Sequence, residues 1–299
     1  MYENGLGIPK DVAESKRLYK IALDEYKRLA EQGNCLAQFK LGYCLAGGTG
    51  IPRDFEAARR WFRKAAEQGD NRAQLYLGLF YFNGTAIAQD RETAVDWLRR
   101  SAEQGNSEAQ FNYGLSLLKG TGVSKDQKAA VIWFRRSAEQ KHAQAQCNLG
   151  YCLENGEGVS KDLKAAVSWY REAAEQGDSL AQHNLGLCLE SGIGTPKNLT
   201  EAVNWYRKAA EQGNPDAQNN LGTCLEHGNG TPKDLEAALV WYHKAFQQGH
   251  ELGKRNMVML HRFLVSRRSL VQTDIDPVDV LEQLEEARLR AKARVEEGY

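Results

Sequence analysis

Hydrophobic and polar positions recur along the chain with a period of 36 residues. Within one period, apolar residues follow spacings of three and four in two separate stretches, which is the pattern of two amphipathic helices. In one unit these stretches are Ala181–Gly186 and Ala202–Ala210, and Gly192 and Gly194 lie between them. A strict period of this length predicts a repeat solenoid in which each unit is one pair of helices.

Two residue types mark the period most clearly. All six tryptophans occupy the same position of the second helix, at Trp61, Trp97, Trp133, Trp169, Trp205 and Trp241. A glycine keeps the same interval in the first helix, at Gly42, Gly78, Gly114, Gly150, Gly186 and Gly222. We expect these twelve residues to be the structural anchors that hold the two helices of each repeat together.

Glycines and capping residues separate the predicted helices. Gly33 and its equivalents close the preceding second helix in the left-handed conformation, and Asn34 and its equivalents cap the next helix. In the loop inside each repeat, Asp54 and its equivalents are expected to cap the second helix. Two repeats depart from this pattern, because Lys141 replaces a closing glycine and Ala86 replaces the second loop glycine.

These motifs resemble the Sel-1-like repeat, a relative of the tetratricopeptide repeat, over roughly residues 2–252. The shared pattern is the Ala-Gln-x-Asn-Leu-Gly helix at 181–186, the Gly-x-Gly loop at 192–194 and the Trp-Tyr-Arg-Lys-Ala-Ala-Glu-x-Gly helix at 205–213. The resemblance implies an all-α fold, namely a right-handed α/α superhelical solenoid of 36-residue helix pairs. It further implies that the first helix of each pair lies on the concave face and that the protein is an adaptor for protein partners.

The chain is predicted to divide into four segments. Residues 1–33 form a partial repeat with an extended helix, which is either an N-terminal cap or the remnant of a longer protein. Residues 34–249 form six repeats, and residues 250–272 form a capping helix. Residues 273–299 form a charged helix that is either solvated, packed on the last repeat or bound to a partner.

Composition excludes several functional classes. The 39 Lys and Arg residues balance 39 Asp and Glu residues, which gives no reason to expect nucleic-acid binding. No stretch approaches the roughly 20 apolar residues of a membrane helix, so we expect no direct membrane insertion. The histidines and cysteines follow no metal-binding or redox spacing, which predicts no metal and no cofactor.

The positions of the cysteines indicate in which cellular compartment the protein resides. Four of the six cysteines share one repeat position, at Cys44, Cys152, Cys188 and Cys224. Equivalent positions of adjacent repeats lie roughly 8 to 10 Å apart, too far for a disulfide, so we expect free, buried thiols. Reduced thiols favour a cytoplasmic location, and the ER lumen or secretion is the alternative if the N-terminus is truncated.

The candidate site is the concave groove. A step of 100° per residue places the residues two before, two after and five after the leucine of the first helix on the face opposite the second helix. This face is apolar in the first three repeats and acidic in the next three; its candidate binding residues are Phe39, Tyr43, Leu79, Phe82, Phe111, Tyr151, Glu154, His183, Glu190 and Glu226. An asparagine ladder precedes the leucine position, at Asn112, Asn148, Asn184 and Asn220.

The predicted function is a non-enzymatic interaction scaffold that binds partner peptides in this groove. The partner would place apolar side chains at the N-terminal repeats and basic side chains at the glutamates, and the asparagines would hold its backbone. In a second interpretation this face is packed between repeats and the glutamates are solvated, and in a third it mediates self-association. At the level of function, the alternatives are a regulatory fragment of a larger enzyme and an activator subunit of a membrane complex.

Overall fold

The computed structural model describes the backbone of residues 12–49 and 51–268, and the side chains of residues 20–49 and 51–266. This described part contains fourteen helices and no strand, which confirms the predicted all-α class. The predicted charged helix of residues 273–299 lies outside the described residues.

Each repeat contributes two helices of thirteen residues, and a loop connects them as predicted. The first helices are α2 (Cys35–Gly47), α4 (Asn71–Asn83), α6 (Ser107–Lys119), α8 (Ala143–Asn155), α10 (Ser179–Ser191) and α12 (Pro215–His227). The second helices are α3 (Phe55–Glu67), α5 (Arg91–Glu103), α7 (Gln127–Glu139), α9 (Leu163–Glu175), α11 (Leu199–Glu211) and α13 (Leu235–Gln247). The long helix α1 (Val12–Glu31) precedes them, and α14 (Glu251–Arg268) follows them.

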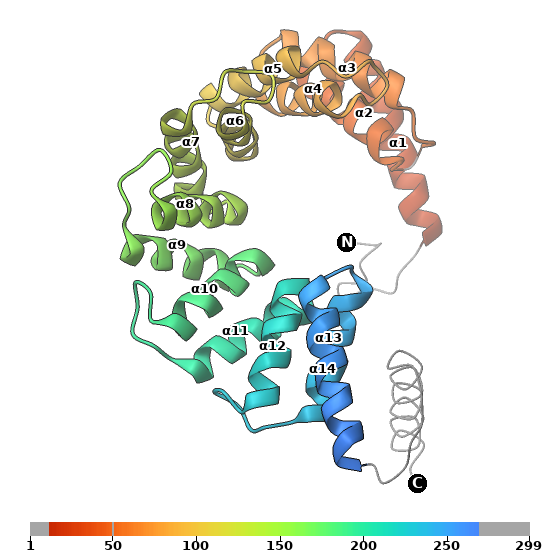
Figure 1. Cartoon of the computed structure of the whole chain (residues 1–299). Coiled ribbons are helices and arrows are strands. Elements are labelled where there is room, and N and C mark those ends of the chain that lie inside the picture. Colours follow the sequence, from red (N-terminus) through yellow and green to blue (C-terminus); the bar gives the residue numbers. More distant parts are fainter. Residues whose placement is uncertain (1–11, 50, 269–299) are drawn as a thin grey trace. The chain divides into compact units, whose positions relative to one another are not determined.

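The chain divides into two compact units. The first unit contains the residues up to Ala145 together with Glu157–Ser160, and the second contains Gln146–Gly156 and the residues from Lys161 onward. In the first unit, the helices from α1 to α7 pack against one another in chain order, and in the second the helices from α9 to α14 do the same (Figure 1). This packing of consecutive helix pairs is that of a solenoid.

The residues that were predicted to cap the helices do so in the structure. The side chain of Asn34 accepts a hydrogen bond from the backbone N–H of Ala37, and Asp54 accepts one from the N–H of Ala57. The two departures keep the backbone of the glycines that they replace, with φ of 56° at Ala86 and 64° at Lys141. A side chain in this conformation costs roughly 1 to 2 kcal/mol, so the repeat architecture dictates the backbone there.

The anchor glycine of each first helix gives space to one large side chain of the second helix. A Cβ atom on Gly42 would lie 2.8 Å from Cδ1 of Phe62, and one on Gly186 would lie 2.5 Å from Cε1 of Tyr206. Both rings are fully buried. The glycine therefore sets the close distance between the two helices of a repeat.

Buried glutamines join consecutive helices through their side chains. In α10, Gln182 is 3% exposed and donates from Nε2 to the carbonyl oxygen of Ala174. Its Oε1 accepts from Nε2 of Gln212, which lies at the end of α11, at 2.8 Å. The same glutamine pair recurs as Gln38 with Gln68, Gln74 with Gln104, Gln110 with Gln140, Gln146 with Gln176 and Gln218 with Gln248. These bonds satisfy polar groups that would otherwise be costly to bury.

The six cysteines are free, as predicted. Cys152, Cys188 and Cys224 are buried, and burial raises the pKa of Cys188 to about 12. The expectation of burial is wrong for Cys44, which is half-buried. Cys188 lies beside Glu154 and Tyr170 of the preceding repeat, whereas among the described residues Cys44 has only α1 before it.

Candidate functional site

The first helices of the second unit carry three carboxylates at equivalent positions. Glu190 on α10 and Glu226 on α12 lie 36 residues apart, and Glu154 occupies the same position in α8. All three side chains are half-buried. We call these three residues the acidic row.

Each carboxylate of the acidic row accepts a hydrogen bond from a buried tyrosine of its own repeat. The phenol oxygens lie 2.7 Å from the carboxylate oxygens in the pairs Tyr170 with Glu154, Tyr206 with Glu190 and Tyr242 with Glu226. Burial first, and then the bond to the carboxylate, raise the pKa of Tyr206 far above its usual range. The phenol therefore stays neutral and donates, and it fixes one oxygen of the carboxylate while the group remains partly exposed.

The first unit lacks both members of this pair. The positions of the tyrosine and the glutamate are occupied there by Phe62 with Ala46, Leu98 with Phe82 and Phe134 with Leu118. Where the second helix offers no hydroxyl, the first helix offers no carboxylate. The first-helix face is thus acidic where the second helix buries a tyrosine and apolar where it buries Phe or Leu. In the sequence, a Glu followed 16 residues later by a Tyr indicates this pair.

The acidic row makes no direct ion pair with the described part of the chain. Among the described residues, none of the ion pairs involves Glu154, Glu190 or Glu226. The negative charge of the row is therefore not neutralised by the described part of the chain.

The asparagine ladder links neighbouring first helices. Nδ2 of Asn220 lies 3.1 Å from Nε2 of His183 in the preceding repeat, and Asn256 on α14 donates from Nδ2 to Oδ1 of Asn219 at 2.9 Å. Asn184 makes the equivalent, longer contact of 4.0 Å to the sulfur of Cys147. The ladder thus extends to Asn256, which the sequence analysis did not include because α14 lacks the Leu-Gly anchor.

Lateral packing of the first helices also decides which predicted site residues are accessible. The exposed members are Tyr43 (48%) and Tyr151 (45%). Leu79, Phe82, Asn112, Asn148, Glu154, Asn184, Glu190, Asn220 and Glu226 are half-buried. Phe39, Phe111 and His183 are buried, so these three do not offer an open surface.

Each of the buried aromatic residues packs against neighbours within its own unit. Phe39 lies 6.0 Å from both Phe62 and Tyr76 between ring centroids, and the guanidinium of Arg72 stacks 4.3 Å above its ring. Phe111 stacks on His142 at 4.9 Å. These contacts make the N-terminal aromatics part of the core of the first unit.

The tryptophan anchors lie on the second helices, and a cation covers most of them. Lys64 lies 4.4 Å above the ring of Trp61, and Arg100 lies 4.7 Å above that of Trp97. The same stacking occurs at Trp133, Trp205 and Trp241. A stacked cation shields an aromatic ring from solvent and contributes modestly to stability, which favours a structural role for these residues.

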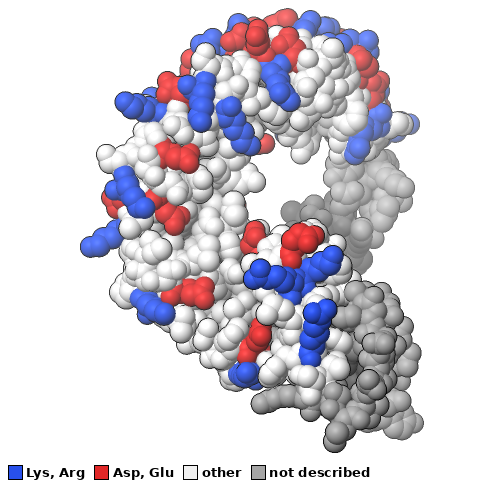
Figure 2. Space-filling model, viewed as in Figure 1, with Lys and Arg blue, Asp and Glu red and all other residues white. Residues whose placement is uncertain are grey.

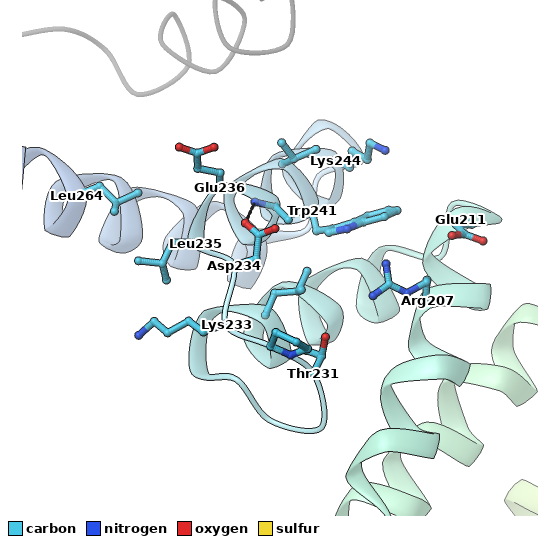
Figure 3. Close-up of a pocket in the computed structure, with 14 residues that line it drawn as sticks. Arg207, Glu211, Thr231, Lys233, Asp234, Leu235, Glu236, Trp241, Lys244 and Leu264 are labelled. Carbon is cyan, nitrogen blue, oxygen red and sulfur yellow. Dashed lines mark hydrogen bonds between the residues drawn. The ribbon is translucent and has the colours of Figure 1, made fainter. Parts of the chain in front are cut away.

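A cleft in the second unit has no member of the acidic row among its lining residues. It measures about 1130 Å³ and is bounded by Arg207, Trp241, Lys244 and the loop from Thr231 to Asp234 (Figure 3). The carboxylate of Asp234 is used there as the N-cap of α13. No His, Cys or Ser is among the residues that line the cleft.

A smaller cleft repeats this one 36 residues earlier. It measures about 490 Å³, and Arg171, Glu175, Thr195 and Pro196 occupy in it the positions of Arg207, Glu211, Thr231 and Pro232. Because the clefts share the repeat period, they follow from the packing of each loop on the preceding second helix.

Neither the face seen in Figure 2 nor the described helices contain a further candidate. Lys and Arg are interspersed with Asp and Glu on the face seen in Figure 2, without an extended area of one sign. Within residues 12–49 and 51–268, no cluster of His, Cys, Asp and Glu is arranged to hold a metal ion. None of the helices in that part combines the length and apolarity needed to cross a bilayer.

A model of the Sel1 repeat matches seven stretches of the chain. They cover residues 1–25, 35–70, 71–106, 107–142, 143–178, 179–214 and 215–250. The chain belongs to the Sel1 repeat family. Sel1 repeat proteins are in general scaffolds for protein interactions, and the solenoid is typically not catalytic.

Two solved Sel1-type structures resemble the chain over most of its length. One is a protective antigen present in uropathogenic Escherichia coli strains, with 35% identity and a TM-score of 0.73 over 88% of this chain. This chain covers 55% of that antigen, about half its length. The other is a Sel1 repeat protein from Oxalobacter formigenes, with 36% identity and a TM-score of 0.66 over 72% of this chain and 86% of its own. A search of curated proteins found no significant match.

Proposed function

We propose that this Sel1 repeat protein is a non-enzymatic scaffold whose first helices bind an extended segment of a partner protein. In the second unit, the partner places Lys or Arg side chains at the acidic row. The observation that carries this proposal is the set of three carboxylates, each oriented by a tyrosine hydroxyl at 2.7 Å and none paired with a cation among the described residues.

The spacing of the row indicates the form of the partner. Packed helices lie roughly 8 to 10 Å apart, so equivalent residues of successive first helices recur at about that distance. A peptide in the extended polyproline II conformation has three residues per turn and rises about 3.1 Å per residue, so every third side chain returns to the same side about 9 Å further along. A basic residue at every third position of an extended segment therefore matches Glu154, Glu190 and Glu226.

Other predicted site residues supply the remaining contacts. Oδ1 of Asn220 already accepts from Nδ2 of Asn219 at 3.3 Å. Because an amide oxygen has two lone pairs and an amide nitrogen two N–H groups, Asn184 and Asn220 can each still hydrogen-bond a peptide backbone. In the first unit, the exposed ring of Tyr43 and the half-buried side chains of Leu79 and Phe82 offer apolar contacts. The partner is therefore expected to be basic where it meets the second unit and apolar where it meets the first.

Selection from a displayed library of random peptides on the full-length chain tests this proposal. The test variant carries Glu154→Gln, Glu190→Gln and Glu226→Gln, which remove the charge but keep an acceptor for each tyrosine hydroxyl. The matched control carries the same change at Glu139, Glu175 and Glu211, three exposed glutamates that share one position of the second helices.

The wild type and the control are expected to enrich peptides with Lys or Arg at every third position, and the acidic-row variant is expected to lose this enrichment. Enrichment of the same peptides by the acidic-row variant would refute the proposal. So would enrichment of purely apolar peptides by all three proteins. A self-association that persists in the acidic-row variant would indicate that the exposed apolar residues bind a second copy instead.

The six free cysteines support the cytoplasm as the location of this scaffold, since reducing compartments keep thiols free.

A further inference from the structure

The helix α14 occupies the place of a first helix but has no following repeat among the described residues. It packs on α13 as each first helix packs on the second helix before it, and it also contacts α12. Asn256 continues the asparagine ladder at its correct position. α14 is therefore the first helix of an incomplete seventh repeat.

One face of α14 is exposed because of this position. Leu252 is 45% exposed and Met259 is 62% exposed, and Arg255 and Arg262 on the same face are exposed as well. At spacings of three, four and three residues, these four side chains lie within one narrow sector of the helix. We call them the outer face of α14.

The equivalent position in earlier repeats is covered by the next first helix. Asn219, which corresponds to Arg255, is 4% exposed and is bonded to Asn256 of α14. His183 is 8% exposed and is in contact with Asn220 of α12. The outer face of α14 is thus the surface on which a solenoid of this kind would continue.

The sequence after α14 is complementary to this face in charge. α14 contains five Lys and Arg residues and one Glu, whereas residues 269–287 contain six Asp and Glu residues and neither Lys nor Arg. Within that stretch, Val278, Leu281 and Leu284 recur every three residues and form an apolar stripe between acidic neighbours. Apolar and acidic side chains on one segment match the apolar and basic side chains on the outer face.

The connection is also of suitable length. Seven residues, 269–275, separate α14 from Asp276-Pro277, which is a helix-start signature. Seven extended residues span about 23 Å, and the eighteen residues of α14 measure about 27 Å. The following segment can therefore reverse direction and lie along the outer face of α14.

We infer that residues 276–287 dock on the outer face of α14 in the same molecule. Leu281 and Leu284 contact Leu252 and Met259, and the acidic side chains pair with Arg255 and Arg262. The short connection makes the docking intramolecular, because it holds the segment at a high effective concentration near the face. This inference is independent of the acidic row and of its partner.

Hydrogen exchange of the full-length chain, followed by mass spectrometry, tests the docking. In the wild type, the amides of residues 278–287 are expected to exchange at least about tenfold more slowly than in an unstructured peptide. The variant Arg255→Glu/Arg262→Glu is expected to lose this protection, while the amides of α10 keep theirs. A matched control, Lys161→Glu/Lys197→Glu, makes the same change of charge at exposed residues in the loops of two earlier repeats and is expected to leave the protection unchanged.

A charge-swap experiment sharpens the test. Adding Glu282→Arg and Glu285→Arg to the α14 variant is expected to restore protection of residues 278–287, since opposite charges again face each other. The inference is overturned if these residues exchange at the unstructured rate in the wild type. It is also overturned if their protection survives Arg255→Glu/Arg262→Glu, or if it grows with protein concentration, which would mean docking between copies.

Discussion

At the scale of single residues, one tyrosine hydroxyl per repeat determines the chemistry of the first-helix face in the second unit. Tyr206 is fully buried, and its hydroxyl donates to the carboxylate of Glu190 at 2.7 Å. In the first unit, Leu98 needs no acceptor, and an apolar Phe82 stands in the position of the glutamate. A buried, unsatisfied hydroxyl costs about 1 to 3 kcal/mol, which is enough to couple the two positions.

A double-mutant cycle on this pair is expected to show that coupling. Glu190→Ala should lower the free energy of unfolding by about 1 to 3 kcal/mol, because it leaves the hydroxyl of Tyr206 without an acceptor. Glu190→Gln should cost little, and adding Tyr206→Phe to Glu190→Ala should recover most of the loss. Urea unfolding measures the wild type, the single variants Glu190→Ala and Tyr206→Phe, the double variant, and Glu190→Gln. Additive effects of the two single changes would show that the bond does not stabilise the repeat.

Among the elements, the second glycine of the loop inside a repeat allows the loop to lie close to the preceding repeat, at Gly122, Gly158, Gly194 and Gly230. A Cβ atom on Gly194 would lie 2.2 Å from the carbonyl oxygen of Leu163, the first residue of α9. Gly177, which closes α9, also has a positive φ, but no atom lies within 4 Å of its Cβ position. A side chain at Gly194 would therefore collide with the backbone of α9, whereas Gly177 is favoured only because of its positive φ.

Substitution of these glycines is expected to differ in cost. Gly177→Ala should destabilise the protein by about 1 to 2 kcal/mol through backbone strain alone, and Gly194→Ala should cost clearly more because it also moves the loop. In the opposite direction, Lys141→Gly should stabilise the protein by about 1 kcal/mol by removing the strain of its positive φ. Thermal unfolding of the three variants measures the order. Equal costs for Gly177→Ala and Gly194→Ala would contradict the close approach of the loop.

Element boundaries were predictable because the determinants are local. Asn34, Asp54 and the closing glycines act within one turn of the chain, so their positions in the sequence state where each helix begins and ends. The positive φ of Lys141 could not be predicted from the residue type, because lysine rarely adopts it. Only its place in the period indicates the left-handed backbone that the structure shows.

For the molecule as a whole, the accessibility of the candidate site depends on contacts between repeats, which a projection around one helix does not include. Projection around one helix places Phe39, Phe111 and His183 on the open face, yet all three are buried. The projection accounts for the second helix of the same repeat but not for neighbouring first helices, such as α12, whose Asn220 lies 3.1 Å from His183. Contacts of this kind join residues 37 positions apart, which periodicity predicts only when several repeats are considered together.

If the acidic row binds basic side chains of a partner, the affinity for a basic peptide must fall as the salt concentration rises. The probe is a labelled peptide of nine residues with Lys at positions 2, 5 and 8, titrated with the full-length chain at several salt concentrations. For wild type and for the Glu139, Glu175 and Glu211 control, binding should weaken as salt rises. The variant with Glu154→Gln, Glu190→Gln and Glu226→Gln should bind about tenfold more weakly at low salt and lose most of that dependence, since each exposed ion pair contributes about 0.2 to 1 kcal/mol. The same affinity and the same salt dependence in all three proteins would contradict the account.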